Sequence, residues 1–255
     1  MRSDIAGVLG ESEQPREVLP PGQRAVDGFP RWGTLLYRPP PAVPADPAIE
    51  ITGRGVAPFA VRLADLAEVQ SVELIADLHC VAGWSATNLR WEGVPFERLY
   101  RGVIQPTVPP EMAITHFVFV GLDDYRCVVA IEDALGEDVL IAHSLNGRPL
   151  DPDHGAPIRL VSPRQYGYVS VKHLCRIELQ AREPDEHVGH ASALANLLTP
   201  RLLFARHPRA RVWHEERNGA LPTCLVRPIY RLLTPPIRIL SAPPRTSKRG
   251  ATDPR

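Results

Sequence analysis

The chain has 255 residues, of which 44% are hydrophobic, and it carries 29 basic and 29 acidic residues. This length and composition predict one soluble globular unit with a substantial core and a small appendage. No stretch reaches the roughly 18 apolar residues that a membrane-spanning helix needs, and the first residues lack the apolar core of a secretion signal. We therefore expect a cytoplasmic protein without a transmembrane segment.

The net charge of zero hides an asymmetry along the chain. From Pro200 onward there are 12 basic and 3 acidic residues, which leaves 17 basic and 26 acidic residues before it. A basic tail can contact an acidic partner, a nucleic acid backbone or anionic lipid, or can simply be solvated, and the charge count does not choose among these.

The order of apolar and turn-forming residues predicts a four-part organisation. Residues 1–47 are rich in proline and predict an extended N-terminal arm; residues 48–182 form the main domain; residues 183–240 form a basic C-terminal extension; residues 241–255 form a disordered tail. Within the extension, Ala191 to Leu198 has the pattern of a helix.

In chain order, the main domain is predicted to consist mostly of strands. Leu63 is expected to open a short helix, and Gly93 to Tyr100 is expected to form a turn and then a short helix with proline in its first turn. Asn146-Gly147 is a strong hairpin signal, because both residues tolerate positive φ. The predicted strands are Ile49–Gly53, Phe59–Arg62, Val72–Leu78, His116–Gly121, Val139–His143, Ile158–Val161 and Ile177–Gln180. Short scattered helices among many strands favour the α+β class, with mixed sheets.

Cys80 follows one of these predicted strands and is the first candidate for chemistry. A thiolate is a soft donor that suits a polarizable transition metal, and metal binding removes its proton. A lone cysteine after a strand is more often a small buried hydrophobic residue, so the reading depends on the rest of the chain. The other cysteines, at 127, 175 and 224, are too far apart for a Cys-x-x-Cys motif, and all four are expected to be reduced thiols. The nine histidines and four cysteines form no closely spaced zinc ligand set.

Five segments taken together resemble the molybdopterin domain of the sulfite oxidase family over roughly Leu19 to Gln180. The segments are Leu19–Gln23 with Phe29–Arg31; Cys80 with Gly83–Ser85 and Trp91–Val94; Asp123–Tyr125; Asn146–Gly147 with Pro149–Leu150, Asp153–Gly155 and Pro157–Arg159; and Gly167 with Ser170–Lys172. Their order and spacing carry the resemblance more than any one motif does.

The resemblance implies a sulfite-oxidase-like molybdopterin-binding fold and a molybdenum cofactor with one pterin, for which Cys80 is the single protein ligand to the metal and the catalytic residue. Trp84 is expected to line the site or to serve in packing. Cations and backbone donors suit the pterin phosphate, because a planar guanidinium can bind phosphate oxygens in pairs and an ammonium acts as a point charge. The cofactor-binding residues that the resemblance implies are Arg31, Cys80, Asp123, His154, Arg159, Ser170, Val171 and Lys172.

The sequence also departs from the family pattern. Sulfite oxidases carry a substrate-site tyrosine shortly after the segment that matches Ser170 to Lys172, but Ala181 to Leu198 contains neither tryptophan nor tyrosine, and His173 replaces a tryptophan. The family's dimerisation domain needs about 100 residues, which the C-terminal extension does not supply. We therefore expect a monomer with no haem in this chain, and the residues do not single out sulfite as the substrate.

Three functions remain open. The first is a molybdenum-dependent oxidoreductase that moves an oxygen atom or two electrons on a small-molecule substrate and exchanges electrons with a separate carrier such as a cytochrome; no nucleic acid partner is expected. The second is a reductase of S-oxides or N-oxides with the same fold. The third is a cofactor-free binding or regulatory module. His79 and His143 are candidate proton shuttles, although each is more often a structural histidine.

Overall fold

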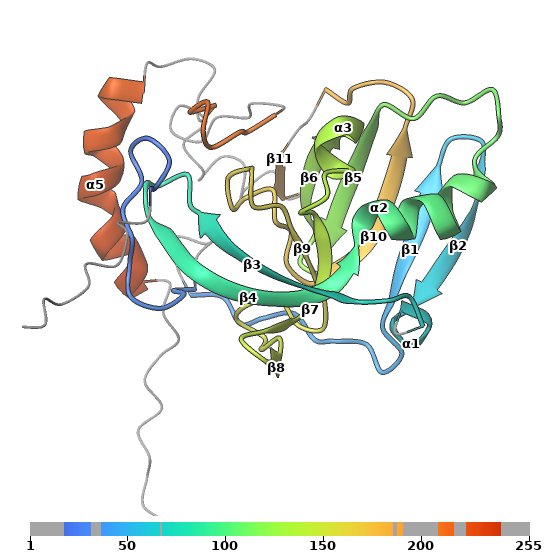
Figure 1. Ribbon diagram of the computed structural model, residues 1–255, viewed down its shortest axis with the longest axis horizontal. Coiled ribbons are helices and arrows are strands. Elements are labelled where there is room, and N and C mark those ends of the chain that lie inside the picture. The colour runs from blue at the N-terminus through green and yellow to red at the C-terminus, as the bar shows by residue number, and fades with distance from the viewer. Residues whose placement is uncertain are drawn as a thin grey trace, which may run out of the picture.

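The protein consists of two β-sheets with short helices around them, as Figure 1 shows for the computed structural model. The structure describes residues 18–31, 37–66, 68–185, 188–190, 209–216 and 223–240. The predicted α+β class is confirmed. The predicted helix from Ala191 to Leu198 and the predicted disordered tail lie outside the described residues.

The larger sheet has six strands in the order β11-β6-β5-β10-β1-β2. Only β1 and β10 pair in parallel; the other neighbours are antiparallel. The strands are β1 Ala48–Gly53, β2 Val56–Arg62, β5 His116–Gly121, β6 Tyr125–Ala130, β10 Leu174–Gln180 and β11 Val188–His190. The apolar run in β5 marks a central strand, and five of its six residues are buried.

The second sheet has five strands, and its long β3–β4 hairpin sweeps across the molecule (Figure 1). The strands are β3 Val72–His79, β4 Ser85–Pro95, β7 Leu140–Leu145, β8 Arg148–Pro149 and β9 Arg159–Val161, the last pairing with β7. Asn146 and Gly147 have φ values of 52° and 74° and join β7 to β8 in a two-residue loop. The predicted hairpin is therefore confirmed, and positive φ at both positions is what such a loop requires.

The helices are short except for the last. They are α1 Leu63–Leu66, α2 Phe96–Leu99, a π-helix at Tyr100–Ile104, a 3-10 turn at Gln105–Thr107, α3 Ile131–Ala134 and α5 Thr223–Leu240. The predicted turn at Gly93 was wrong, because Gly93 to Pro95 complete strand β4. Pro95 is also the N-cap of α2 rather than a residue of its first turn. Among the described residues, no helix combines the length and the apolar character needed to cross a membrane.

The core lies between the two sheets and is centred on aromatic side chains. Phe96 of α2 makes edge contacts with Phe117 and Phe119 of β5, at centroid distances of 5.0 and 5.1 Å. Trp91 of β4 is wholly buried as well. Edge-to-face packing of this kind adds to the gain from burial itself. The core therefore fixes β4, whose first residue follows the turn that begins at Cys80.

Part of the basic extension docks on the main domain. Val212 is wholly buried, and the Tyr166 amide donates to the Ala210 carbonyl at 2.9 Å. Arg209 and Arg211 both form ion pairs with Asp133 of α3. Residues 209–216 thus complete the core beside α3, and basic side chains there meet the acidic body within the same molecule.

Candidate functional site

Cys80 lies in a tight turn between β3 and β4. Its amide donates to the Trp84 carbonyl at 2.8 Å, and its carbonyl accepts from the Gly83 amide at 2.9 Å. Gly83 has a φ of 87°, a conformation that glycine adopts without a steric penalty. The Ala82 amide lies 3.5 Å from the Cys80 sulfur. Because backbone contacts fix both sides of the turn, the sulfur has a defined direction before any ligand binds.

The N-terminal segment packs against this turn through a parallel bridge between Ala25 and Ser85. The Arg24 amide donates to the Gly83 carbonyl at 3.2 Å, and the Arg24 carbonyl accepts from the Ser85 amide at 2.8 Å. The Val26 amide donates to the Ser85 carbonyl at 2.9 Å. The Gln23 side chain adds a buried link, because its amide nitrogen donates to the Cys80 carbonyl at 3.1 Å while its oxygen accepts from the Ser85 hydroxyl at 3.1 Å. Gln23 and Ser85 both belong to segments that carry the family resemblance, but no role was predicted for either of them.

His79 continues this chain of hydrogen bonds. Its Nδ1 lies 2.8 Å from the Ser85 hydroxyl, and its backbone carbonyl accepts from the Gly167 amide at 2.7 Å. Burial lowers the pKa of His79, which favours the neutral ring. His143 is likewise hydrogen-bonded, through its two ring nitrogens to Ser71 and Ser144. The geometry therefore gives both histidines structural contacts, and at His79 these contacts tie the cysteine turn to the loop before Ser170.

Replacing Gln23 with alanine is expected to loosen the cysteine turn. The substitution leaves the Cys80 carbonyl and the buried Ser85 hydroxyl without this partner, which costs about 1–3 kcal/mol of unfolding free energy. We also expect activity to fall by roughly 10- to 100-fold, as is typical when a residue that orients a ligand is removed. Urea unfolding and a steady-state assay measure the two effects, with the exposed Gln105→Ala as the control. Equal behaviour of the two variants would contradict this role for Gln23.

Arg159 is the central residue of a second group, which we call the cationic group and which also contains Arg31 and Lys172. Its side chain is 1% exposed and donates to the carbonyls of His154 at 2.9 Å, Ser170 at 2.8 Å and Leu160 at 3.3 Å. Its guanidinium also lies 5.4 Å from the centre of the Trp91 ring. Burial lowers the pKa of Arg159 to about 9. Within the described part of the chain, no carboxylate forms an ion pair with it, so its charge is held by neutral dipoles and aromatic faces.

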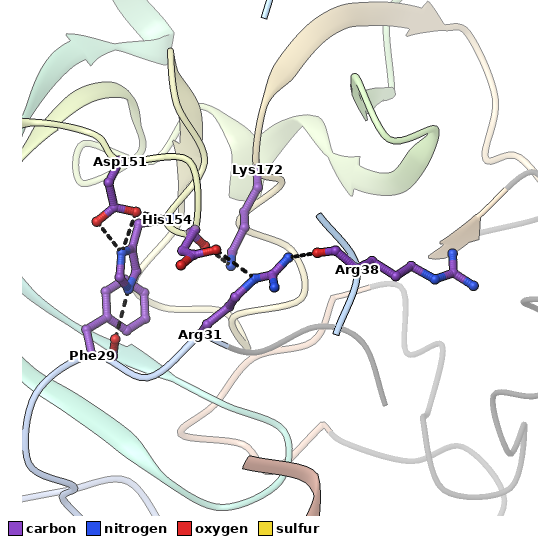
Figure 2. Close-up of polar contacts among 7 residues, drawn as sticks. Phe29, Arg31, Arg38, Asp151, His154 and Lys172 are labelled. Carbon is purple, nitrogen blue, oxygen red and sulfur yellow. Dashed lines mark hydrogen bonds and ion pairs between the residues drawn. The ribbon is translucent and has the colours of Figure 1, made fainter. Parts of the chain in front are cut away.

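Arg31 and Lys172 approach the same region from the N-terminal segment and from the loop before β10 (Figure 2). Arg31 pairs with the Asp153 carboxylate at 3.1 Å, and Lys172 donates to the Asp153 carbonyl at 2.6 Å. Arg31 Nη1 is buried and has no hydrogen-bond partner among the described residues. Burial, followed by repulsion from Arg159 and Arg31, lowers the pKa of Lys172 to about 7. Lys172 is one of only two lysines in the chain, the other being Lys248.

His154 links the N-terminal segment to this cationic group. Its Nε2 lies 2.8 Å from the Phe29 carbonyl, and its Nδ1 lies 2.8 Å from the Asp151 carboxylate (Figure 2). Asp151 and Phe29 thus hold the imidazole from its two opposite ring nitrogens. The Phe29 ring lies 4.6 Å from the imidazole and also contacts Trp91 edge-on. Phe29 therefore holds the N-terminal segment over the cationic group.

The remaining predicted residues differ in what they present. Ser170 is buried, and its hydroxyl accepts from the Ser162 amide at 3.1 Å. Val171 is buried too and acts through its backbone, accepting from the Leu160 amide at 2.8 Å. Asp123 is exposed in a turn, where its carboxylate accepts from the Tyr125 amide at 3.2 Å. Its negative charge raises the pKa of Lys172 slightly and so offsets a part of the lowering that burial causes. This local contact is what an aspartate in a turn makes without any ligand.

Two positions near this group show how closely the backbone is packed. Gly155 has a φ of 108°, and a Cβ there would lie 3.1 Å from the Lys172 Cβ and 3.2 Å from the Arg159 Cβ. His173 has a φ of 54° and donates from Nδ1 to the Ala156 carbonyl at 2.6 Å. The histidine that replaces the family's tryptophan is thus buried and tied to the backbone, which supports a packing role. Trp84 is also buried in the core, where packing accounts for its place.

The cationic residues suit an anionic ligand, and the cysteine turn suits a soft metal. Arg31, Arg159 and Lys172 bring positive charge together in a partly buried region, and a phosphate would relieve the repulsion among them. Cys80 offers a thiol in a preformed turn. No group of three or more His, Cys, Asp or Glu side chains among the described residues is placed to hold a metal ion. A metal at Cys80 would therefore take its other ligands from a cofactor.

The stability of the cofactor-free protein is expected to depend on pH through Lys172. Its pKa is 10.5 when unperturbed and about 7 in the folded chain, so the unfolded chain binds more protons between these values. The free energy of unfolding should rise across this interval, by roughly 2 kcal/mol once screening of the partly exposed side chain is allowed for. Urea unfolding at both ends of the interval measures the rise. Lys172→Met should reduce this rise and Lys248→Met should keep it; an unchanged rise in Lys172→Met would contradict the assignment to Lys172.

A model of the oxidoreductase molybdopterin binding domain matches residues 38–188. The match includes every predicted site residue except Arg31, and it contains both the cysteine turn and most of the cationic group. The resemblance expected from the five segments is confirmed.

Curated relatives match over the same part of the chain. The protein-methionine-sulfoxide reductase catalytic subunit of Xanthomonas campestris is 29% identical over 54% of this chain and 46% of its own length. The NADPH nitrate reductase of Beauveria bassiana is 30% identical over 52% of this chain and 15% of its own. An uncharacterized oxidoreductase, YuiH of Bacillus subtilis, is 31% identical over 48% of this chain and 59% of its own. The chain thus spans about half the length of the first of these relatives.

A solved structure, the sulfane dehydrogenase SoxCD of Paracoccus pantotrophus, aligns with a TM-score of 0.47 and 22% identity. The alignment covers 66% of this chain and 44% of that one.

Proposed function

The chain belongs to the family of oxidoreductase molybdopterin binding domains, and on this premise we propose that it is a molybdenum-dependent oxidoreductase that transfers two electrons or an oxygen atom on a small substrate. The observation that carries the proposal is the cationic group around Arg159. Arg31 Nη1 is buried without a hydrogen-bond partner among the described residues, and Arg159 and Arg31 repel the Lys172 ammonium, so a bound anion would supply an acceptor and relieve the repulsion. The phosphate of a molybdopterin is an anion of the required kind.

The residues divide into two roles. Cys80 would supply the thiolate ligand to molybdenum, and the hydrogen bonds through Gln23, Ser85 and His79 orient its turn. Arg31, His154, Arg159 and Lys172 would bind the phosphate and the pterin, with the buried backbone of Ser170 and Val171 fixing the loop beside them. When bound, the cofactor supplies a metal that changes its oxidation state by two electrons. The protein contributes position, charge and exclusion of water.

Reduction of S-oxides is a second candidate, because relatives from Xanthomonas and from Ralstonia nicotianae are named protein-methionine-sulfoxide reductases. In that direction an S-oxide takes up two electrons and two protons and leaves as a sulfide and water. N-oxides undergo the same change. The cofactor-free module is the opposing reading, and it predicts purified protein without molybdenum or pterin.

We further propose that a separate carrier, such as a cytochrome, exchanges electrons with this chain, since the Xanthomonas relative is named a catalytic subunit. A monomer without haem in this chain, located in the cytoplasm, completes the proposal.

The test is the molybdenum and pterin content of the full chain, purified from a host that makes molybdopterin. Elemental mass spectrometry gives the metal per chain, and fluorescence of the released pterin gives the cofactor. The proposal expects close to one of each. The loaded protein is then assayed with sulfite and an electron acceptor, and with dimethyl sulfoxide and a reduced dye. Absence of metal and pterin from well-folded protein would overturn the proposal.

A further inference from the structure

Helix α5 carries an apolar stripe on its exposed side. Five of the nine large hydrophobic residues that are exposed in the described part of the chain lie on this helix. They are Leu225, Ile229, Leu232, Ile239 and Leu240, with exposed fractions from 39% to 77%. At 3.6 residues per turn, the first four fall within an arc of about 80° around the helix axis. The stripe runs along almost the whole helix.

The same helix is basic and contains no acidic residue. Arg231 and Arg238 are exposed and lie about 120–140° around the helix axis from the centre of the stripe. A third arginine, Arg227, pairs with Glu215 in the docked part of the extension. The sequence around the helix continues this character, with 12 basic and 3 acidic residues from Pro200 onward. Helix α5 thus combines an exposed apolar stripe with arginines on the polar side of the helix.

The helix stands at one end of the molecule, outside both sheets and beside the N-terminal segment (Figure 1). A backbone hydrogen bond from Tyr37 to the Leu240 carbonyl, 2.9 Å long, anchors its last residue. Pro228, Pro235 and Pro236 lie inside the helix and cannot donate backbone hydrogen bonds, which weakens it. A weak helix that keeps apolar side chains in water gains most from a surface that buries them.

We propose that α5 binds the surface of an anionic lipid bilayer, with its axis parallel to the membrane plane. Leu225, Ile229, Leu232 and Ile239 would enter the acyl boundary, while Arg231 and Arg238 would meet lipid phosphates. An amphipathic helix with an apolar face and basic residues on its polar face is the kind of helix that binds at this interface. An acidic protein would satisfy the arginines but would leave the apolar stripe without a matching environment.

The experiment is co-sedimentation of the full chain with vesicles of phosphatidylcholine and phosphatidylserine in a roughly 3:1 ratio, and with phosphatidylcholine alone. We expect binding to the mixed vesicles that weakens with salt. The double variant Arg231→Gln, Arg238→Gln should bind about 30-fold more weakly, since each basic residue near an anionic surface contributes a factor of about five. The double variant Leu225→Ser, Leu232→Ser should lose at least about tenfold.

The matched controls are Ile75→Ser, which removes an equally exposed apolar residue from β3, and Arg148→Gln, which removes an exposed arginine from β8. Both should bind as the native chain does. Circular dichroism shows whether each helix variant stays folded, and the arginine variant keeps the test valid if the apolar one does not. Failure to bind mixed vesicles, equal binding to neutral vesicles, or binding that the α5 variants leave unchanged would overturn the proposal. Molybdenum content does not enter this readout, so the lipid proposal and the proposed function are tested independently.

Discussion

Cys80→Ser is expected to lose molybdenum and activity together. A serine hydroxyl is a harder donor than a thiolate and is not ionised at neutral pH, so the metal loses the protein ligand that suits it. Activity should fall by more than the roughly 10- to 100-fold that follows from removing a residue that only orients a ligand. The metal per chain and the rate per chain are measured on protein from the same host.

The control for Cys80→Ser is Cys175→Ser, which changes a half-buried thiol in β10. This variant should keep metal and activity within a factor of about two, because a substitution away from the site usually has a small effect. The Cys80 turn is closed by backbone hydrogen bonds, so the serine variant should keep its fold. Full molybdenum and full activity in Cys80→Ser would rule out ligation by this residue.

Arg159→Met is expected to lower the free energy of unfolding of the cofactor-free protein by about 1–3 kcal/mol, as is typical when buried polar groups lose their hydrogen-bond partner. Three carbonyls from separate parts of the chain would lose their donor, and the similar volume of methionine does not replace it. Removing a buried charge also relieves its desolvation, which works in the opposite direction. The hydrogen bonds should outweigh that relief, because two of them are short, at 2.9 and 2.8 Å.

Urea unfolding measures the change in Arg159→Met, and Arg148→Met serves as the control because Arg148 is exposed. The control should stay within about 0.5 kcal/mol of the native chain. The Arg159 variant should also retain little pterin when it is produced in a host that makes the cofactor. Unchanged stability combined with full pterin content would show that Arg159 neither holds the loop before Ser170 nor binds the cofactor.

The sequence predicted most of the strands because they are short apolar runs bounded by turn residues. His116–Gly121 was predicted with the bounds that β5 has in the structure. The Asn146-Gly147 loop was also predictable, since its two residues specify a hairpin locally. Residues of the cationic group were placed from the family resemblance, and the structure brings Arg31, His154, Arg159 and Lys172 into one region.

Other features were missed for physical reasons. Strand β4 alternates buried Leu89 and Trp91 with exposed Arg90 and Glu92, a period of two that was available in the sequence, but Gly93 was read as a turn. Helix α5 was missed because its three prolines argue against a helix.

The link from Gln23 to Cys80 spans 57 positions, so no local pattern reveals it. Contacts of this kind depend on how the chain packs, and only the three-dimensional structure shows them.

The place of β10 in the larger sheet has a consequence for the order of folding. The β1–β2 hairpin joins this sheet only through β10, which follows β1 by more than 100 positions in the chain. During synthesis, at roughly 5–20 residues per second, the β10-facing edge of β1 has no pairing partner from this sheet until residues 174–180 have emerged. Ile49 and Ile51, both wholly buried in the folded protein, belong to β1 and therefore lie in a strand whose edge is unpaired at that stage. The exposed edge of β1 should therefore make the nascent chain dependent on chaperones until β10 pairs with it. Because this pairing joins distant parts of the chain, the protein should also fold slowly for its size.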